Sequence, residues 1–470
     1  MKITLIVLIC IISIGILVAC NNAQPILSTS TPEEEATTTE TTEKVETVIP
    51  TTSTNEPTNT IAPPTSTPTA ELNEKKPVIE HLDEGEVLTL TSIKMIENTT
   101  GWGVGNDGID DHILRTLDGG DSWLDITPPE SASLGEGIGK RAMSYFLDVD
   151  HGWATYYPDR DYQFEPSSVW YTTDGGESWE ESSPLDGTGL DTFFEPRQLY
   201  FHDEFFGWLM LGHDRGVGNA PVTIYRTADG GRNWDRVIDP FSDENSGFIH
   251  ICCQSGMVFT DSKTGLITSQ DGPVETAYVN WTYDGGLSWQ EQILPAADEN
   301  LFSRAWCGTR SPVVRAPKSI ALVVECLDAS QEPALNVAFF YSSEDNGQTW
   351  EYSQLPVPPL EKGTWDYLRR THNIDFMNQD LGWAFTSDFF QLQGGEESYA
   401  LTHIYHSVDE GVSWEEVKTV SWMGVFSFID LQNGWAAAFS KDESALVRTV
   451  DEGRTWQMMT PQVAPESNSP

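Results

Sequence analysis

The sequence predicts an all-β fold made of seven repeated units. One octet recurs seven times along the chain, and the tryptophans that end successive copies are 56, 55, 55, 61, 64 and 42 residues apart. A near-constant spacing of this order is typical of repeat architectures. Short runs rich in β-branched and aromatic residues lie before and after the octets, as expected for strands.

The octet has the pattern Ser/Thr-x-Asp-x-Gly-x-Ser/Thr-Trp, and Asn233 is the one departure at its seventh position. An Asp side chain bonds the backbone of a turn, and Gly supplies the positive φ that such a turn requires. We therefore expect each octet to be a hairpin turn whose Trp points inward and seals neighbouring sheets. The copies occupy residues 116–123, 172–179, 227–234, 282–289, 343–350, 407–414 and 449–456.

A second element, Gly-Trp, precedes the octet in most units. It starts at Gly101, Gly152, Gly207, Gly382 and Gly434. The fourth unit has Gly-Leu at 265–266 instead, and the fifth lacks the element. The two elements together account for 12 of the 17 tryptophans, which predicts that these rings belong to the core and not to a sugar-binding platform.

The octet resembles the Asp-box, or BNR, repeat of sialidases, sortilin-type receptors, xyloglucanases and photosystem II assembly factors. The pairing with Gly-Trp is most similar to the seven-bladed photosystem II assembly-factor-like propellers, over roughly residues 85–460. The resemblance implies a seven-bladed β-propeller of four-stranded antiparallel blades, with each octet between the third and fourth strands of a blade. It also implies that the Asp-box carboxylates are structural and lie away from the ligand site. These residues are Asp118, Asp174, Asp229, Asp284, Asp345, Asp409 and Asp451.

The catalytic motifs of related enzymes are missing. A sialidase would carry a Phe/Tyr-Arg-Ile-Pro segment, and the chain has none. The xyloglucanases that share this repeat have two propellers facing each other across a cleft, whereas the repeats of this chain are enough for one propeller. The sequence also has no Gly-x-Ser-x-Gly or His-Glu-x-x-His motif. We expect binding in preference to catalysis and no cofactor, with a sialidase- or xyloglucanase-like glycoside hydrolase as the alternative.

The N-terminus resembles a bacterial lipoprotein signal. Lys2 is followed by an apolar run that ends in Leu-Val-Ala-Cys at residues 17–20. A run of this length fits a cleaved signal core, and in such proteins the Cys of this motif carries the lipid. We predict a signal peptide at 1–19, lipidation of Cys20 and an extracytoplasmic protein anchored to the bacterial membrane. An uncleaved anchor helix is the alternative.

The remaining chain divides by composition. Residues 20–79 are rich in Thr, Pro and Glu, which predicts a disordered linker. The propeller is expected at 80–463 and a disordered tail at 464–470. Of the net charge of −46, residues 1–20 contribute +1 and residues 21–78 contribute −6, which leaves −41 for residues 79–470. So acidic a domain repels phosphate backbones and argues against a nucleic-acid partner.

Four cysteines remain for the folded part in an oxidising compartment. Cys307 and Cys326 lie within one unit and are the candidate disulfide. Pairing across units is the alternative, and Cys252 and Cys253 stay unassigned. Acidic clusters at 106–111 and at 159–161 lack the spacing of a calcium loop, so we predict no metal site.

The candidate binding face lies opposite the Asp-boxes, where the segments of variable length are expected to be loops. The longest are 295–319, 356–373 and 239–256. The first two hold basic and aromatic residues that are scarce elsewhere, and loops on a rigid scaffold commonly carry recognition. We expect them to bind a protein or glycan near the fifth and sixth blades, in a role such as assembly of an envelope complex. These residues are Trp306, Arg310, Arg315, Trp365, Tyr367, Arg369 and Arg370.

Overall fold

The computed structural model describes eleven stretches of the chain, and every described strand belongs to one compact unit, residues 73–470. The predicted signal peptide, Cys20, most of the linker and the end of the tail lie outside the described residues. The described stretches are 78–130, 138–159, 168–190, 194–213, 221–241, 253–270, 276–331, 335–358, 365–392, 398–441 and 443–465.

Seven antiparallel sheets follow one another along the chain, which confirms the predicted seven-bladed β-propeller. The first blade contains β1 (Leu90–Met95), β2 (Gly101–Asn106), β3 (Asp111–Thr116) and β4 (Ser122–Asp125). The second contains β5 (Lys140–Phe146), β6 (Gly152–Pro158), β7 (Trp170–Thr172) and β8 (Glu180–Glu181). The third contains β9 (Phe194–Phe201), β10 (Gly207–His213), β11 (Val222–Thr227) and β12 (Asp235–Ile238).

The fourth blade contains β13 (Gln254–Phe259), β14 (Gly265–Ser269), β15 (Tyr278–Thr282) and β16 (Gln290–Ile293). The fifth is preceded by α1 (Glu299–Phe302) and contains β17 (Trp306–Thr309), β18 (Val313–Ala316), β19 (Ser319–Asp328), β20 (Leu335–Ser343) and β21 (Glu351–Gln354). The sixth contains β22 (Trp365–Phe376), β23 (Gly382–Leu392), β24 (Ser398–Ser407) and β25 (Glu415–Val420). The seventh contains β26 (Met423–Phe428), β27 (Gly434–Phe439), β28 (Ser444–Thr449) and β29 (Gln457–Met458).

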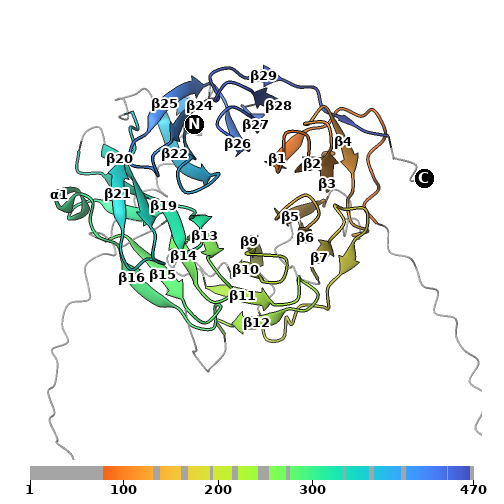
Figure 1. Cartoon of the computed structure of the whole chain (residues 1–470), viewed down its shortest axis with the longest axis horizontal. Helices are drawn as coiled ribbons and strands as arrows, with labels where there is room; N and C mark the ends of the chain where they lie inside the picture. The colour runs from red at the N-terminus through yellow and green to blue at the C-terminus, as the bar shows by residue number, and fades with distance from the viewer. Residues whose placement is uncertain are drawn as a thin grey trace, which may run out of the picture. The chain divides into compact units, whose positions relative to one another are not determined.

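The blades form a ring with the first strand of each blade towards the centre (Figure 1). The last strand, β30 (Gln462–Val463), pairs in parallel with β4, so the end of the described chain completes the first blade. A bridge between Val87 and Gln462 ties the two ends of the domain together. This pairing protects the ring from opening, because propeller edges are covered only when the ring is closed.

Each octet connects the third and fourth strands of its blade, as expected, and each Gly-Trp begins a second strand. In the third blade, for example, Phe201, Gly207 and Thr227 are aligned at one end of the sheet. All Asp-boxes therefore lie at one face of the ring, which we call the Asp-box face. The turns between second and third strands lie at the opposite face.

Aromatic stacking between adjacent blades seals the ring, and the Gly-Trp tryptophans supply most of it. Trp153 stacks flat on Phe201 of the next blade at 3.6 Å, and Trp208 stacks on Phe259 at 3.4 Å. The phenylalanine in each of these stacks is also contacted edge-on by the octet tryptophan of its own blade, as Phe201 is by Trp234. The octet tryptophans also contact neighbouring blades, as expected. Trp414 of the sixth blade lies edge-on to Phe340 of the fifth, and Trp179 of the second blade donates to the Ile126 carbonyl of the first.

One helix, α1, is present in the described stretches, and no helix there is long and apolar enough to cross a bilayer. Its N-terminus is capped by Asp298, whose carboxylate accepts the backbone N–H groups of Asn300 and Leu301.

Candidate functional site

The Asp-box carboxylates are fully engaged within their own turns. Asp118 accepts hydrogen bonds from the Thr116 hydroxyl at 2.9 Å, the Ser122 N–H at 2.9 Å and the Ser122 hydroxyl at 2.6 Å. The same three bonds recur in the other six boxes, and Asn233 replaces the hydroxyl with its side-chain amide at 2.8 Å. Partial burial raises the pKa of Asp118, but these bonds outweigh it and hold the pKa below the usual value. This geometry fits the structural role expected of these residues.

The acidic cluster at 106–111 is likewise used by the backbone. Asp107 accepts the N–H groups of Ile109 and Asp110, at 2.6 and 2.7 Å. Asp110 accepts the N–H of Lys140, and Asp111 accepts that of Ala142 in the second blade. These bonds join the first two blades. Among the residues that the structure describes, no group of three or more His, Cys, Asp or Glu is placed to hold a metal ion.

The predicted binding residues whose side chains are described do not all lie together. Trp306 begins β17 and lies at the face opposite the Asp-boxes, because it pairs with Leu327 at the far end of β19. Arg315 is on β18, at the Asp-box end of the same blade. The two residues therefore mark opposite faces, and both belong to strands and not to the loop expected at 295–319.

Arg315 is buried and structural, which corrects its assignment to a binding face. Its guanidinium lies over the rings of Phe340 and Phe376, at 5.8 and 5.2 Å. It also donates to the carbonyl oxygen of Glu410 at 2.9 Å and pairs with Glu344. The fifth blade lacks Gly-Trp, and this arginine joins it to the sixth blade instead.

Arg370 is also buried. Its guanidinium donates two hydrogen bonds to Asp388, at 2.5 and 2.7 Å, and one to the Pro358 carbonyl at 3.0 Å. A bidentate pair of this kind fixes both partners and leaves the arginine little capacity for a ligand. Trp365, Tyr367 and Arg369 share the strand β22 with it, so the loop expected at 356–373 is partly a strand. The side chains of these three residues lie outside the described part.

Trp306 and Arg310 do line one pocket, of about 390 Å³, beside the first strand of the fifth blade at the face opposite the Asp-boxes. Trp306 is 56% exposed, which is unusual among the tryptophans of this chain. Arg310 donates to Glu325 through Nε at 2.8 Å and through a second nitrogen. The pocket is completed by Gln270, Cys307, Gly308 and Leu327.

Cys307, which lines this pocket, forms a disulfide with Cys326. The two cysteines are directly opposite on β17 and β19, with 19 residues of sequence separation. Gly308 is the next residue, and a Cβ there would lie 1.7 Å from the carbonyl oxygen of Gln270 in the fourth blade. Only glycine permits this close approach, so the wall of the pocket is fixed by two blades and a covalent link.

Glu325 is the centre of a buried polar network behind the pocket. Besides Arg310 it accepts a hydrogen bond from Asn336 at 2.6 Å, and His372 Nε2 lies 3.8 Å away. Burial raises the pKa of Glu325, but His372, Arg310 and Asn336 together hold it below the usual value. Burial lowers the pKa of His372 to about 4. Near neutral pH the network therefore holds an ionised Glu325 and a neutral His372.

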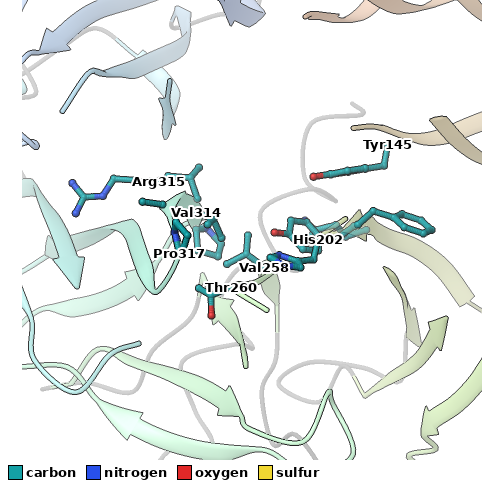
Figure 2. Close-up of a pocket in the computed structure, with 13 residues that line it drawn as sticks. Tyr145, His202, Val258, Thr260, Val314, Arg315 and Pro317 are labelled. Atoms are coloured by element: carbon teal, nitrogen blue, oxygen red, sulfur yellow. The ribbon is translucent and has the colours of Figure 1, made fainter. Parts of the chain in front are cut away.

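A second pocket, of about 510 Å³, lies inside the ring at the Asp-box face (Figure 2). Its walls come from the first strands of the second to fifth blades and the residues that follow them. Tyr145, Tyr200, Val258 and Val314 lie on these strands, and His202 follows one of them. Of the predicted binding residues only Arg315 is among the described residues that line this pocket, because only the closed ring brings the four blades together.

The sequence did contain a local signal for the phenylalanines at the ends of the first strands, two of which stack on Gly-Trp tryptophans. Phe146, Phe201, Phe259, Phe376 and Phe428 each stand six positions before the Gly that starts the next strand. Glu325, His372 and Asp388 had no such repeated signal. Their partners are on other strands, so single-sequence spacing could not select the two carboxylates among 72 acidic residues or His372 among nine histidines.

Comparisons with known proteins agree with the repeat. The sequence model of the BNR/Asp-box repeat matches residues 170–181, the octet of the second blade with its flanks. The chain is 26% identical over 198 residues to the Photosystem II assembly lipoprotein Ycf48 of Synechococcus sp. (strain CC9902), covering 42% of this chain and 47% of that protein. The chain therefore carries an Asp-box propeller similar to that of a photosystem II assembly factor.

A second similarity is to an enzyme. A probable oligoxyloglucan-reducing end-specific xyloglucanase of Neosartorya fischeri is 24% identical over 293 residues, which are 61% of this chain and 29% of the enzyme. The chain thus spans less than half the length of either curated relative. Among solved structures, the GH74 xyloglucanase of Xanthomonas campestris aligns with a TM-score of 0.33 and 12% identity, covering 80% of this chain and 64% of that one.

Proposed function

We propose that this chain is a surface lipoprotein whose propeller binds a protein or glycan partner through the pocket of Trp306. The observation that carries the proposal is the exposed indole beside a fixed Arg310–Glu325 pair. Tryptophan and arginine are enriched where binding energy concentrates. The disulfide and the approach of Gln270 keep the pocket in shape without a ligand, which lowers the entropy cost of binding.

The electrostatics of the pocket favour binding over hydrolysis. A glycoside hydrolase needs a carboxylic acid with a raised pKa as proton donor and a second carboxylate nearby. Glu325 has a lowered pKa and is the one carboxylate among the described residues that line this pocket. Its bonds to Arg310 and Asn336 occupy the oxygens that a proton donor would offer to a glycosidic bond.

A glycoside hydrolase is the second candidate, and the similarity to a xyloglucanase favours it. Incubation of the purified chain with xyloglucan oligosaccharides, followed by chromatography of the products, tests this activity. We expect no release of product. Turnover that is lost in Glu325→Gln would replace the binding proposal by an enzymatic one.

The binding test uses the purified full-length chain, an array of envelope glycans and crosslinking to envelope extract. We expect specific retention of one glycan class or one protein complex. Trp306→Ala should weaken this retention at least tenfold, as is typical of a central aromatic contact. Tyr352→Ala is the matched control, because Tyr352 is a similarly exposed aromatic residue on the outermost strand β21. Equal retention by Trp306→Ala and wild type would contradict the proposal.

A further inference from the structure

The pocket inside the ring is a different site from that of Trp306. It opens at the Asp-box face, since His202 and Thr260 follow the ends of β9 and β13 at that face. Trp306 lies at the opposite end of the fifth blade. A ligand in one pocket therefore does not contact residues of the other.

Most polar groups in the central pocket are already bonded. Gln198 donates to the Met257 carbonyl at 2.9 Å and accepts its N–H at 2.6 Å. The Tyr200 hydroxyl donates to the Phe259 carbonyl at 2.9 Å, and the same oxygen lies 3.2 Å from His202 Nδ1. These bonds tie the third blade to the fourth, and they leave an apolar surface towards the cavity.

Tyr145 differs from the equivalent Tyr200. Both stand one position before the last residue of a first strand, opposite a Gly-Trp tryptophan. The two rings meet edge-on at 5.4 Å. Among the described residues, however, the Tyr145 hydroxyl has no hydrogen-bond partner, and it points across the pocket towards the wall that contains Val314 (Figure 2). Burial raises the pKa of Tyr145, so the hydroxyl keeps its proton and remains a donor.

The charges of the site exclude most ionic ligands. No carboxylate is among the described residues that line the pocket. Among the described lining residues the one guanidinium is that of Arg315, which points away from Tyr145 (Figure 2) and is paired with Glu344. An anion would meet no unpaired lysine or arginine among the described lining residues and would be repelled by the charge of −41 on residues 79–470. A cation would find no carboxylate among those residues.

We propose that the central pocket binds a neutral aromatic ring that carries a hydrogen-bond acceptor, with Tyr145 as the donor. Apolar pockets with a few convergent polar groups are typical binding sites, and aromatic rings pack favourably edge-to-face on tyrosines. A sugar fits less well, because most of its hydroxyls would lose water without gaining a partner. The ring belongs either to a free small molecule or to an aromatic side chain of a partner.

Saturation-transfer NMR with the purified full-length chain tests the site. Acetophenone is the neutral aromatic probe, N-acetyl-L-tyrosinamide represents a side chain, and benzoate and methyl β-D-glucopyranoside are the charged and saccharide comparisons. We expect binding of at least one neutral aromatic probe and much weaker binding of the other two. Tighter binding of acetophenone indicates a free small molecule, and tighter binding of the amide indicates a partner side chain.

Two variants locate the binding. Tyr145→Phe removes only the hydroxyl and should weaken the binding of the neutral aromatic probe about three- to tenfold, the value of one neutral hydrogen bond. Val258→Phe fills the pocket and should weaken this binding further. Tyr352→Phe, on the outer strand of the fifth blade, should leave the affinity unchanged. Absence of binding by both neutral aromatic probes, or an unchanged affinity in Tyr145→Phe, would overturn the proposal.

Discussion

Trp435 Nε1 donates a hydrogen bond of 2.8 Å to the carbonyl oxygen of Gly119, 316 residues earlier in the chain. The donor begins the second strand of the seventh blade, and the acceptor is in the Asp-box of the first. The same bond joins Trp153 to Gly230 and Trp208 to Gly285 in consecutive blades. The first and seventh blades are thus joined by the same Trp-to-glycine hydrogen bond that joins other neighbouring blades.

The closing bond predicts the effect of Trp435→Phe. The substitution keeps an aromatic ring but leaves the buried Gly119 carbonyl without its donor and creates a small cavity. We expect the free energy of unfolding to fall by about 2 to 4 kcal/mol. Urea unfolding followed by fluorescence measures it. Trp306→Phe is the control, since Trp306 is exposed, and a loss of equal size there would contradict the explanation.

The Asp-boxes predict a loss of stability in acid. All seven carboxylates have pKa values below the usual one in the folded chain. Their stabilising effect is complete above the unfolded pKa, about 3.9, and is lost as the pH falls through the lower folded values. We therefore expect the melting temperature to fall steeply below about pH 4. Asp118→Asn should lower the melting temperature near pH 6 and flatten its decline in acid. A decline that stays as steep in this variant would speak against the Asp-box origin.

Two boxes carry a strained glutamate. The fourth box position is Gly at residues 119, 175, 230 and 285, but Glu410 and Glu452 occupy it with φ of 64° and 67°. A side chain in the left-handed region costs about 1 kcal/mol relative to glycine. Glu410→Gly should therefore raise the free energy of unfolding by about 1 kcal/mol, and Glu410→Ala should not. Equal effects of the two substitutions would show that the backbone angle is not the cause.

The disulfide predicts the behaviour of Cys307→Ala. A link that closes a loop of about this length typically contributes about 3 kcal/mol, mainly by restricting the unfolded chain. We expect a fall of about that size in urea unfolding, together with weaker binding at the adjacent Trp306 pocket. Wild-type protein kept in reductant should approach the stability of the variant. If the variant is as stable as the oxidised wild type, the disulfide does not stabilise the fold or the Trp306 pocket.

The lipid anchor is tested at Cys20. Cells that express the chain and are fed a labelled fatty acid should produce a labelled protein if, as we propose, the thiol at this position carries the lipid. Cys20→Ala should abolish the label and release the protein from the membrane fraction. The control is Cys307→Ala, which leaves the predicted signal sequence unchanged. Labelling that persists in Cys20→Ala would refute the assignment of the lipid to Cys20, and an unlabelled variant that stays in the membrane fraction would favour an uncleaved helix as the anchor.

The sequence by itself determined the number of blades and the place of each Asp-box. This was possible because every hydrogen bond of the Asp118 carboxylate lies within four residues along the chain, so the motif can be read locally. The Gly-Trp spacing likewise marked the second strands. The cysteine spacing offered Cys307 and Cys326 as a pair, which the structure joins.

Only the tertiary structure decided which side chains are available to a ligand. Arg315 and Arg370 looked like binding residues in the sequence, yet their partners Glu410 and Asp388 are 95 and 18 residues away and bury them. Tyr145 and Tyr200 occupy equivalent positions, and the described residues of the neighbouring blade satisfy the hydroxyl of Tyr200 but not that of Tyr145. The availability of a polar group depends on which atoms the closed ring brings beside it, and that information is not local to any repeat.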